Sequence, residues 1–122
     1  MRALVLSGGG AKGAFQAGAL QQLLGVDKTR YEILCGVSVG AINAAHIAQY
    51  RLGDEEECAA QLAKLWDSIS TPQVHKRWFP FGRLHGLWKP SLYNSAPLRK
   101  FLTKNIDSEK VKESGKLLSL GA

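Results

Sequence analysis

The chain has 122 residues and a mass of 13.3 kDa, which predicts one domain rather than two. Hydrophobic residues make up 45% and charged residues 21% of the chain, so wholesale disorder is excluded. No apolar run approaches the ~20 residues of a membrane-spanning helix. Lysine and arginine number 16 against 10 acidic residues, and the formal net charge of +6 indicates an anionic partner.

The two cysteines and the N-terminus indicate a reducing compartment. Cys35 and Cys58 are too few for a disulfide framework, and both lie in apolar patterns, so we interpret them as buried free thiols. The apolar run after Arg2 stops at Ser7, short of the ~7–15 apolar residues of a signal peptide. We therefore expect a cytoplasmic protein.

Hydrophobic periodicity predicts alternating strands and helices in the first part of the chain. Gly25 is expected to end the first helix, and the pair Asp54 and Glu57 predicts a capping box at the start of the third. The expected strands are 3–7 and 31–35, and the expected helices are 14–24, 40–50 and 54–69.

The remainder begins with a loop from Pro72 to about Tyr93. A helix is then expected from Asn94 or Ser95, with Pro97 in its first turn. One more helical turn at 108–113, closed by Gly115, precedes a third strand at 116–120. This order predicts a parallel sheet with helices on its faces. It also divides the chain into residues 1–70, 71–93 and 94–122.

The first motif is the run GGGAKG, which extends from Gly8 to Gly13 between a strand and a helix. It fits the dinucleotide pattern G-x-G-x-x-G, but that site needs an acidic residue at the end of the second strand. Glu32 lies at the beginning of that strand instead. A tight turn alone explains only one or two glycines. The backbone N–H groups of such a run can hold a phosphate or an oxyanion.

The second motif is GVSVG, from Gly36 to Gly40, again between a strand and a helix. It fits G-x-S-x-G, the nucleophile elbow, in which a strained turn exposes the serine hydroxyl. An elbow serine needs donors for the oxyanion, and the first motif can supply them. Both motifs follow strands of a parallel sheet, so we expect them at the same edge.

Taken together, the two motifs and their spacing of about 25 residues resemble the patatin-like phospholipase family. The segment SLYNSAPL at 91–98 also resembles that family's sequence before a helix. The resemblance implies a three-layer α/β/α fold with a mostly parallel sheet, here incomplete at the C-terminus. It implies a lipid ester as substrate and no metal or cofactor.

The resemblance also implies roles for individual residues. Ser38 would be the nucleophile, and the glycine loop would form the oxyanion hole. Lys12, Gly13, Gly36 and Gly40 would support the two motifs. The oxyanion-hole residues implied are Gly8, Gly9 and Gly10.

The family's catalytic base is missing from this sequence. The family uses an aspartate in a D-G-[GA] motif, and none of the four aspartates here is followed by glycine. His46 lies roughly 12 Å along the helix from Ser38, so we expect it to be a packed helix residue. Asp67 with His75 or His85 meets the order Ser…Asp…His only nominally. We expect this chain to be the N-terminal portion of one domain, with the base outside it.

The segment from Val74 to Leu92, the basic aromatic segment, combines four cations with four large aromatic residues. Between Ser68 and Ile106 there are seven basic residues and no acidic one. Three interpretations stay open for the segment: rings packed on the core, a lipid interface, or single-stranded nucleic acid. The elbow serine favours lipid, so we expect peripheral membrane contact and no nucleic acid.

Two functional hypotheses follow. The first is a serine acyl hydrolase that cleaves lipid esters with Ser38. The alternative is a non-catalytic chain that binds lipid or a partner through the basic aromatic segment. The sequence does not indicate an oligomeric state.

Overall fold

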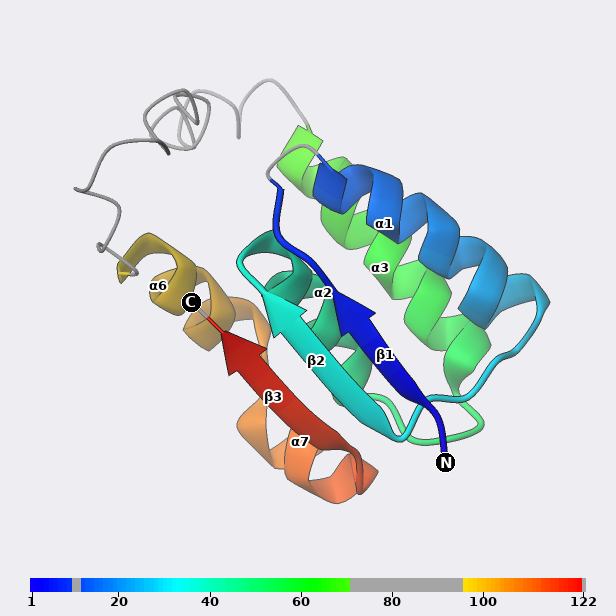
Figure 1. The fold of residues 1–122 in the computed structure, drawn as a ribbon. Helices are drawn as coiled ribbons and strands as arrows, with labels where there is room; N and C mark the ends of the chain where they lie inside the picture. Colours follow the sequence, from blue (N-terminus) through cyan, green and yellow to red (C-terminus); the bar gives the residue numbers. More distant parts are fainter. Residues whose placement is uncertain (10–11, 71–95, 122) are drawn as a thin grey trace.

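The computed structural model describes residues 1–9, 12–70 and 96–121, which form a parallel sheet and a layer of helices (Figure 1). Leu4 pairs with Leu34, and Leu34 pairs with Leu118, so the strands begin at one edge of the sheet and end at the other. The expected α/β class with a parallel sheet is confirmed. Within these ranges the strands are β1 (Ala3–Leu6), β2 (Ile33–Val37) and β3 (Leu117–Gly121), in the order β1-β2-β3.

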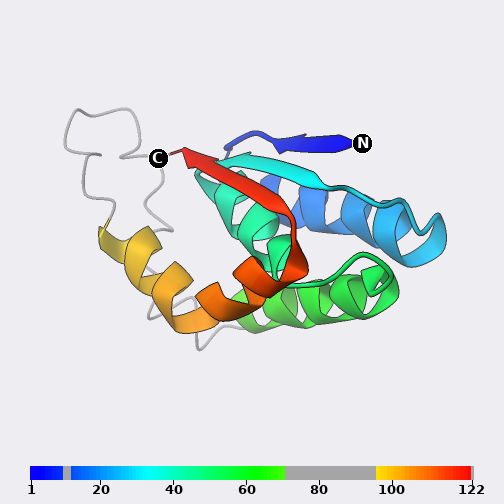
Figure 2. The same ribbon diagram turned by 90° about the horizontal axis from the view of Figure 1, so that it is seen from below.

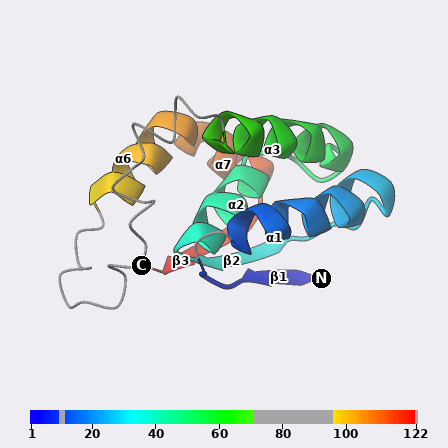
Figure 3. The same cartoon turned by 90° about the horizontal axis from the view of Figure 1, so that it is seen from above.

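The helices of the described ranges all lie on the same side of the sheet (Figure 2, Figure 3). On the other side Val5, Val37 and Leu117 are exposed. Parallel sheets are normally covered on both faces. The described ranges therefore contain two layers of the three that the family resemblance implies. The helices are α1 (Lys12–Leu20) with its π-helical continuation η1 (Gln21–Val26), α2 (Val39–Ala48), α3 (Glu55–Ser70), α6 (Ala96–Asn105) and α7 (Ser108–Ser114).

The central helix α2 is buried along its length, since every residue from Gly40 to Ala48 is buried. It packs against β2 on one side and against α1 and α3 on the other. Its alanines allow these close approaches, and a helix that is apolar all round is a buried helix. The largest fully buried apolar side chains of this core are Leu20, Leu24, Leu34 and Leu62, together with Ile47 of α2 itself.

The first helical segment ends later than expected. Gly25 lies inside η1, and the helical hydrogen bonds continue past it, since the Asp27 N–H donates to the Gln22 carbonyl at 2.9 Å. A Cβ at position 25 would lie 3.3 Å from the Cβ of Ala59, so this glycine allows α3 to approach closely. The prediction that Gly25 ends the helix was therefore wrong.

The capping box expected at α3 is also absent. The Asp54 N–H donates to the Arg51 carbonyl, and the Glu57 carboxylate accepts from the Gln61 side chain. The carboxylate that accepts a backbone N–H here is that of Glu55, because its two oxygens lie 3.0 Å from the Gly53 nitrogen.

The last helices follow the expected pattern more closely. Gly115 ends α7 with φ 73°, as predicted, and Asp107 caps its N-terminus by accepting from the Glu109 and Lys110 N–H groups. Pro97 lies in the first turn of α6. The cap expected at Asn94 or Ser95 falls outside the described residues.

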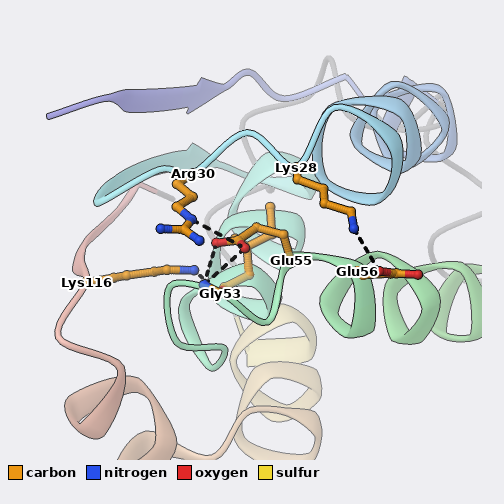
Figure 4. Close-up of polar contacts among 7 residues, drawn as sticks. Lys28, Arg30, Gly53, Glu55, Glu56 and Lys116 are labelled. Carbon is orange, nitrogen blue, oxygen red and sulfur yellow. Dashed lines mark hydrogen bonds and ion pairs between the residues drawn. The ribbon is translucent and has the colours of Figure 1, made fainter.

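The edge at which β2 and β3 begin is held by charged groups (Figure 4). Glu55 is only 5% exposed, and Arg30 Nε lies 3.9 Å from its carboxylate. Lys116, just before β3, donates from Nζ to the Ile47 carbonyl at 3.3 Å, near the C-terminus of α2. Buried charges need such partners, and a cation at a helix C-terminus also opposes the helix dipole.

The two cysteines are free thiols, but only one is fully buried. Cys58 is 1% exposed, whereas Cys35 is half-buried, so the expectation of two buried thiols holds only in part. Burial raises the pKa of Cys58 to about 12. Its thiol therefore stays protonated and unreactive at neutral pH.

His46 lies inside the core, as expected for a packed helix residue. Its Nε2 lies 3.3 Å from the Cys58 carbonyl, and its ring lies 5.2 Å from that of Tyr50. Burial lowers the pKa of His46, and the Cys58 carbonyl only partly opposes this. The neutral ring therefore donates from Nε2 to Cys58.

We expect the free energy of unfolding to decrease as the pH falls below the unfolded-state pKa of about 6.5. In that range the unfolded chain takes up a proton at His46 while the folded chain does not, and the decrease ends at the lowered folded pKa. His46→Gln should remove this part of the pH dependence. Urea unfolding at about pH 8 and about pH 5 measures it for both proteins. An equal decrease in both would contradict the assignment to His46.

Candidate active site

Ser38 occupies the turn between β2 and α2 in a backbone conformation that side chains rarely adopt. Its φ is 54° and its ψ is −121°, and it is the N-cap residue of α2. Such a conformation costs roughly 1–3 kcal/mol and persists only where the surroundings impose it. Here the Ser38 N–H donates to the Gly121 carbonyl at 3.3 Å, and its carbonyl accepts from the Ala41 N–H at 2.9 Å.

The Ser38 side chain is exposed. Among the residues that the structure describes, no hydrogen-bond partner is found for its hydroxyl. The hydroxyl lies at the N-terminus of a ten-residue helix, where the aligned peptide dipoles favour negative charge. It is therefore accessible to a reactant, and an anion that forms beside it would be stabilised.

The glycines on either side of Ser38 allow backbone to pack on backbone. A Cβ at Gly36 would lie 2.6 Å from the carbonyl carbon of Gly40 and 2.7 Å from the Cα of Ala41. A Cβ at Gly40 would collide with the carbonyl groups of Leu6 and Ser7. Neither position can hold a side chain, so the ends of β1 and β2 and the start of α2 meet here.

The first glycine of the other motif lies directly against Ser38. A Cβ at Gly8 would be 3.1 Å from Cβ and 3.8 Å from Oγ of Ser38. Gly9 has φ 141°, which favours glycine. Within the described part of the chain, the Gly8 and Gly9 N–H groups donate no hydrogen bond. Two free donors thus occur in a loop that contacts the serine.

Of the other residues of that motif, Gly13 is fully described, whereas Gly10 and the Lys12 side chain are not. Gly10 lies outside the described residues, and Lys12 begins α1 with its side chain undescribed. Gly13 is buried, and a Cβ there would lie 2.5 Å from Val39 Cγ1 and 2.7 Å from Trp66 Cη2. Gly13 therefore serves the packing of α1 on α2 and α3.

Sequence reasoning missed a buried polar cluster behind the two motifs. Asn43 of α2 is fully buried and accepts from Trp66 Nε1 at 2.8 Å. Its Nδ2 donates to the Gly13 carbonyl at 3.3 Å and to Gln16 Oε1 at 3.1 Å, and Gln16 Nε2 donates to the Ser7 carbonyl at 2.7 Å. The available signal was Asn43 itself, an amide within a run of small and apolar residues.

Two of the four aspartates of the chain serve the structure elsewhere. Asp27 accepts from Gln22 Nε2 at the end of η1, and Asp107 caps α7. Asp54 lies in the turn before α3, and Asp67 is exposed on α3. His75 and His85, the nominal partners of Asp67, lie outside the described residues.

Neither a metal site nor a membrane-spanning helix occurs in the part of the chain that the structure describes. In residues 1–9, 12–70 and 96–121, no group of three or more histidine, cysteine or acidic side chains could hold a metal ion. None of the helices described is both long and apolar enough to cross a membrane. The basic aromatic segment falls within residues 71–95, outside the described part.

Comparison with known proteins supports one family. No curated protein and no solved structure gave a significant match. The family model for patatin-like phospholipase matches residues 4–121, from β1 to β3, and this match includes both glycine motifs. The chain therefore belongs to the patatin-like phospholipase family, a family of lipid acyl hydrolases.

Proposed function

We propose that this chain supplies the nucleophile and the oxyanion hole of a serine hydrolase that cleaves lipid esters. The observation that carries the proposal is the turn at Ser38. Its hydroxyl is exposed at a strained strand-to-helix turn, and a Cβ added at Gly8 would lie 3.1 Å from the Ser38 Cβ. A serine held beside free N–H donors is the arrangement that acyl transfer needs.

The proposed reaction has two stages. The Ser38 oxygen bonds to the ester carbonyl carbon, its proton passes to a base, and the carbonyl electrons move onto the oxygen. The Gly8 and Gly9 N–H groups, with Gly10 as a third donor, hold this oxyanion. When the intermediate collapses, the bond to the alcohol breaks and the alcohol takes the proton. Water then cleaves the acyl-serine in the same way and releases the fatty acid.

The base in this proposal is an aspartate outside the 122-residue chain. The carboxylates of Asp27 and Asp107 accept hydrogen bonds at helix ends, and His46 forms a hydrogen bond with the Cys58 carbonyl inside the core. The dyad of Ser38 with an external aspartate is supported by the family membership and by these alternative roles.

We expect a fluorophosphonate probe to label Ser38 in the protein that contains both this chain and the aspartate. The exposed hydroxyl should attack the phosphorus, and the loop donors should stabilise the phosphonyl oxygen. Ser38→Ala should abolish labelling and reduce ester hydrolysis by at least about 10³-fold. Mass spectrometry of the labelled peptide and initial hydrolysis rates measure the two effects.

The matched control is Ser119→Ala, which removes another exposed serine of the same sheet, on β3. It should leave labelling and hydrolysis unchanged. A folded protein that is not labelled, or that is labelled equally after Ser38→Ala, would exclude Ser38 as the nucleophile.

The 122-residue chain by itself should hydrolyse a short-chain ester no faster than about tenfold above its Ser38→Ala variant, because the base is missing. An activated ester measured with both proteins at equal concentration tests this. Robust turnover that is lost in Ser38→Ala would show that the base lies within the chain. No turnover in the longer protein either would favour the alternative, a non-catalytic chain that binds lipid or a partner.

We also propose that the basic aromatic segment makes peripheral contact with an anionic membrane. Its cations would approach the headgroups at up to about 1 kcal/mol each. Replacing its four cations by glutamine should weaken binding to anionic vesicles by at least about tenfold. Raising the salt concentration should also weaken the binding. The four positions are Lys76, Arg77, Arg83 and Lys89.

The matched control for vesicle binding removes four exposed lysines of the described helices and loops. Co-sedimentation with the vesicles should change by less than about twofold in this variant. Equal losses in both variants would assign the attraction to net charge alone. The four positions are Lys28, Lys64, Lys110 and Lys112.

A further inference from the structure

The polar cluster at Asn43 is a directional chain of hydrogen bonds that is buried at Asn43 and reaches the surface where Gln16 meets Ser7. It begins at Trp66 on α3, passes through Asn43 on α2 and Gln16 on α1, and ends at the Ser7 carbonyl after β1. The indole N–H of Trp66 can only donate, so the Asn43 oxygen must face it. The Asn43 nitrogen must then face Gln16, and the direction of every later bond follows.

Gln16 therefore has one possible orientation. Its oxygen accepts from Asn43 Nδ2 at 3.1 Å, so its nitrogen is the group that donates to Ser7 at 2.7 Å. Asn43 uses both of its N–H bonds, since it also donates to the Gly13 carbonyl at 3.3 Å. No buried side-chain nitrogen or oxygen atom in the described part lacks a hydrogen-bond partner, and those of Asn43 are among them.

The last bond fixes a peptide group that belongs to the glycine loop. The Ser7 carbonyl and the Gly8 N–H are two ends of one planar unit, and no peptide bond in the described part is cis. In a trans peptide the carbonyl and the N–H point in opposite directions. When Gln16 holds the carbonyl, it also sets the direction of the Gly8 N–H.

We infer that Gln16 and Asn43 are positioning residues that aim the Gly8 N–H at the oxyanion formed beside Ser38. The inference rests on the proposed function, in which this N–H is an oxyanion donor. Asn43 lies on α2, the helix that begins at Ser38, so the same helix locates the nucleophile and, through Gln16, the donor. The Ser38 hydroxyl and the Gly8 N–H are thereby held at fixed positions relative to each other.

Gln16 is the residue to change, because it is only half-buried, whereas Asn43 is fully buried and Asn43→Ala would also remove the bonds to Gly13 and Trp66. Gln16→Met keeps the length of the side chain and removes the donor to Ser7. The matched control is Gln21→Met on η1. Gln21 also donates from a side-chain nitrogen to a backbone carbonyl, that of Ala59 at 2.6 Å, away from the glycine loop.

We expect Gln16→Met to shift the Gly8 amide resonance in ¹H–¹⁵N spectra of the 122-residue chain, because the peptide group between Ser7 and Gly8 loses the bond that holds its carbonyl. Gln21→Met should leave the Gly8 resonance in place. In the longer protein that contains the aspartate, Gln16→Met should lower the maximal rate of Ser38 phosphonylation by roughly tenfold or more, with little change in the probe concentration for half-maximal rate. Gln21→Met should change neither quantity by more than about twofold.

Failure of this inference and failure of the proposed function give different results. If Ser38 is phosphonylated but both variants react like the unchanged protein, or if the Gly8 resonance does not move in Gln16→Met, the positioning role is wrong. If Ser38 is never phosphonylated, the proposed function is wrong, and the Gly8 resonance still decides whether Gln16 orients this peptide group.

Discussion

The backbone of Gly40 lies so close to the carbonyl groups of Leu6 and Ser7 that no side chain fits between them. The rest of the candidate site depends on this contact. It brings the end of β1 against the first turn of α2, and the loop that leaves β1 must then pass over Ser38. Gly36 adds a second contact of the same kind, between the end of β2 and α2. Two glycines thus place the nucleophile and the loop donors side by side by letting backbone pack on backbone.

The buried helix α2 has to pack closely against its neighbours and also to pair its own buried polar side chains. Most residues of α2 are small and apolar, which permits the close packing with β2, α1 and α3. Its two buried polar side chains, Asn43 and His46, form hydrogen bonds with different residues of the neighbouring helices. Asn43 is bonded to α1 and α3, and His46 to the Cys58 carbonyl of α3. Because unpaired polar groups in the core are costly, these bonds allow few alternative rotations of the helix.

The sequence predicted the strands, the parallel sheet and the place of both motifs, because these depend on local patterns. Apolar runs followed by glycine identified β1 and β2, and G-x-S-x-G identified the turn at Ser38 before its φ of 54° was known. The errors came from groups whose role depends on distant partners. Gly25 looked like a helix stop because glycine often ends helices, yet it faces Ala59 of α3. Glu57 had the spacing of a capping box, but Gln61 is its partner.

The same reason explains why the polar cluster at Asn43 could not be predicted. Its partners lie 23 to 30 residues away in the chain, so no local pattern records them.

The two ends of the strands differ in how far their polar groups are paired. Where β2 and β3 begin, Glu55 accepts a hydrogen bond from the Gly53 N–H, and Lys116 donates one to the Ile47 carbonyl. Where the strands end, the Gly8 and Gly9 N–H groups donate no hydrogen bond to the residues that the structure describes, and they lie beside a strained serine. Strain and unpaired donors cost stability, so they persist where the strands end because the close packing around α2 holds the turn at Ser38 in place.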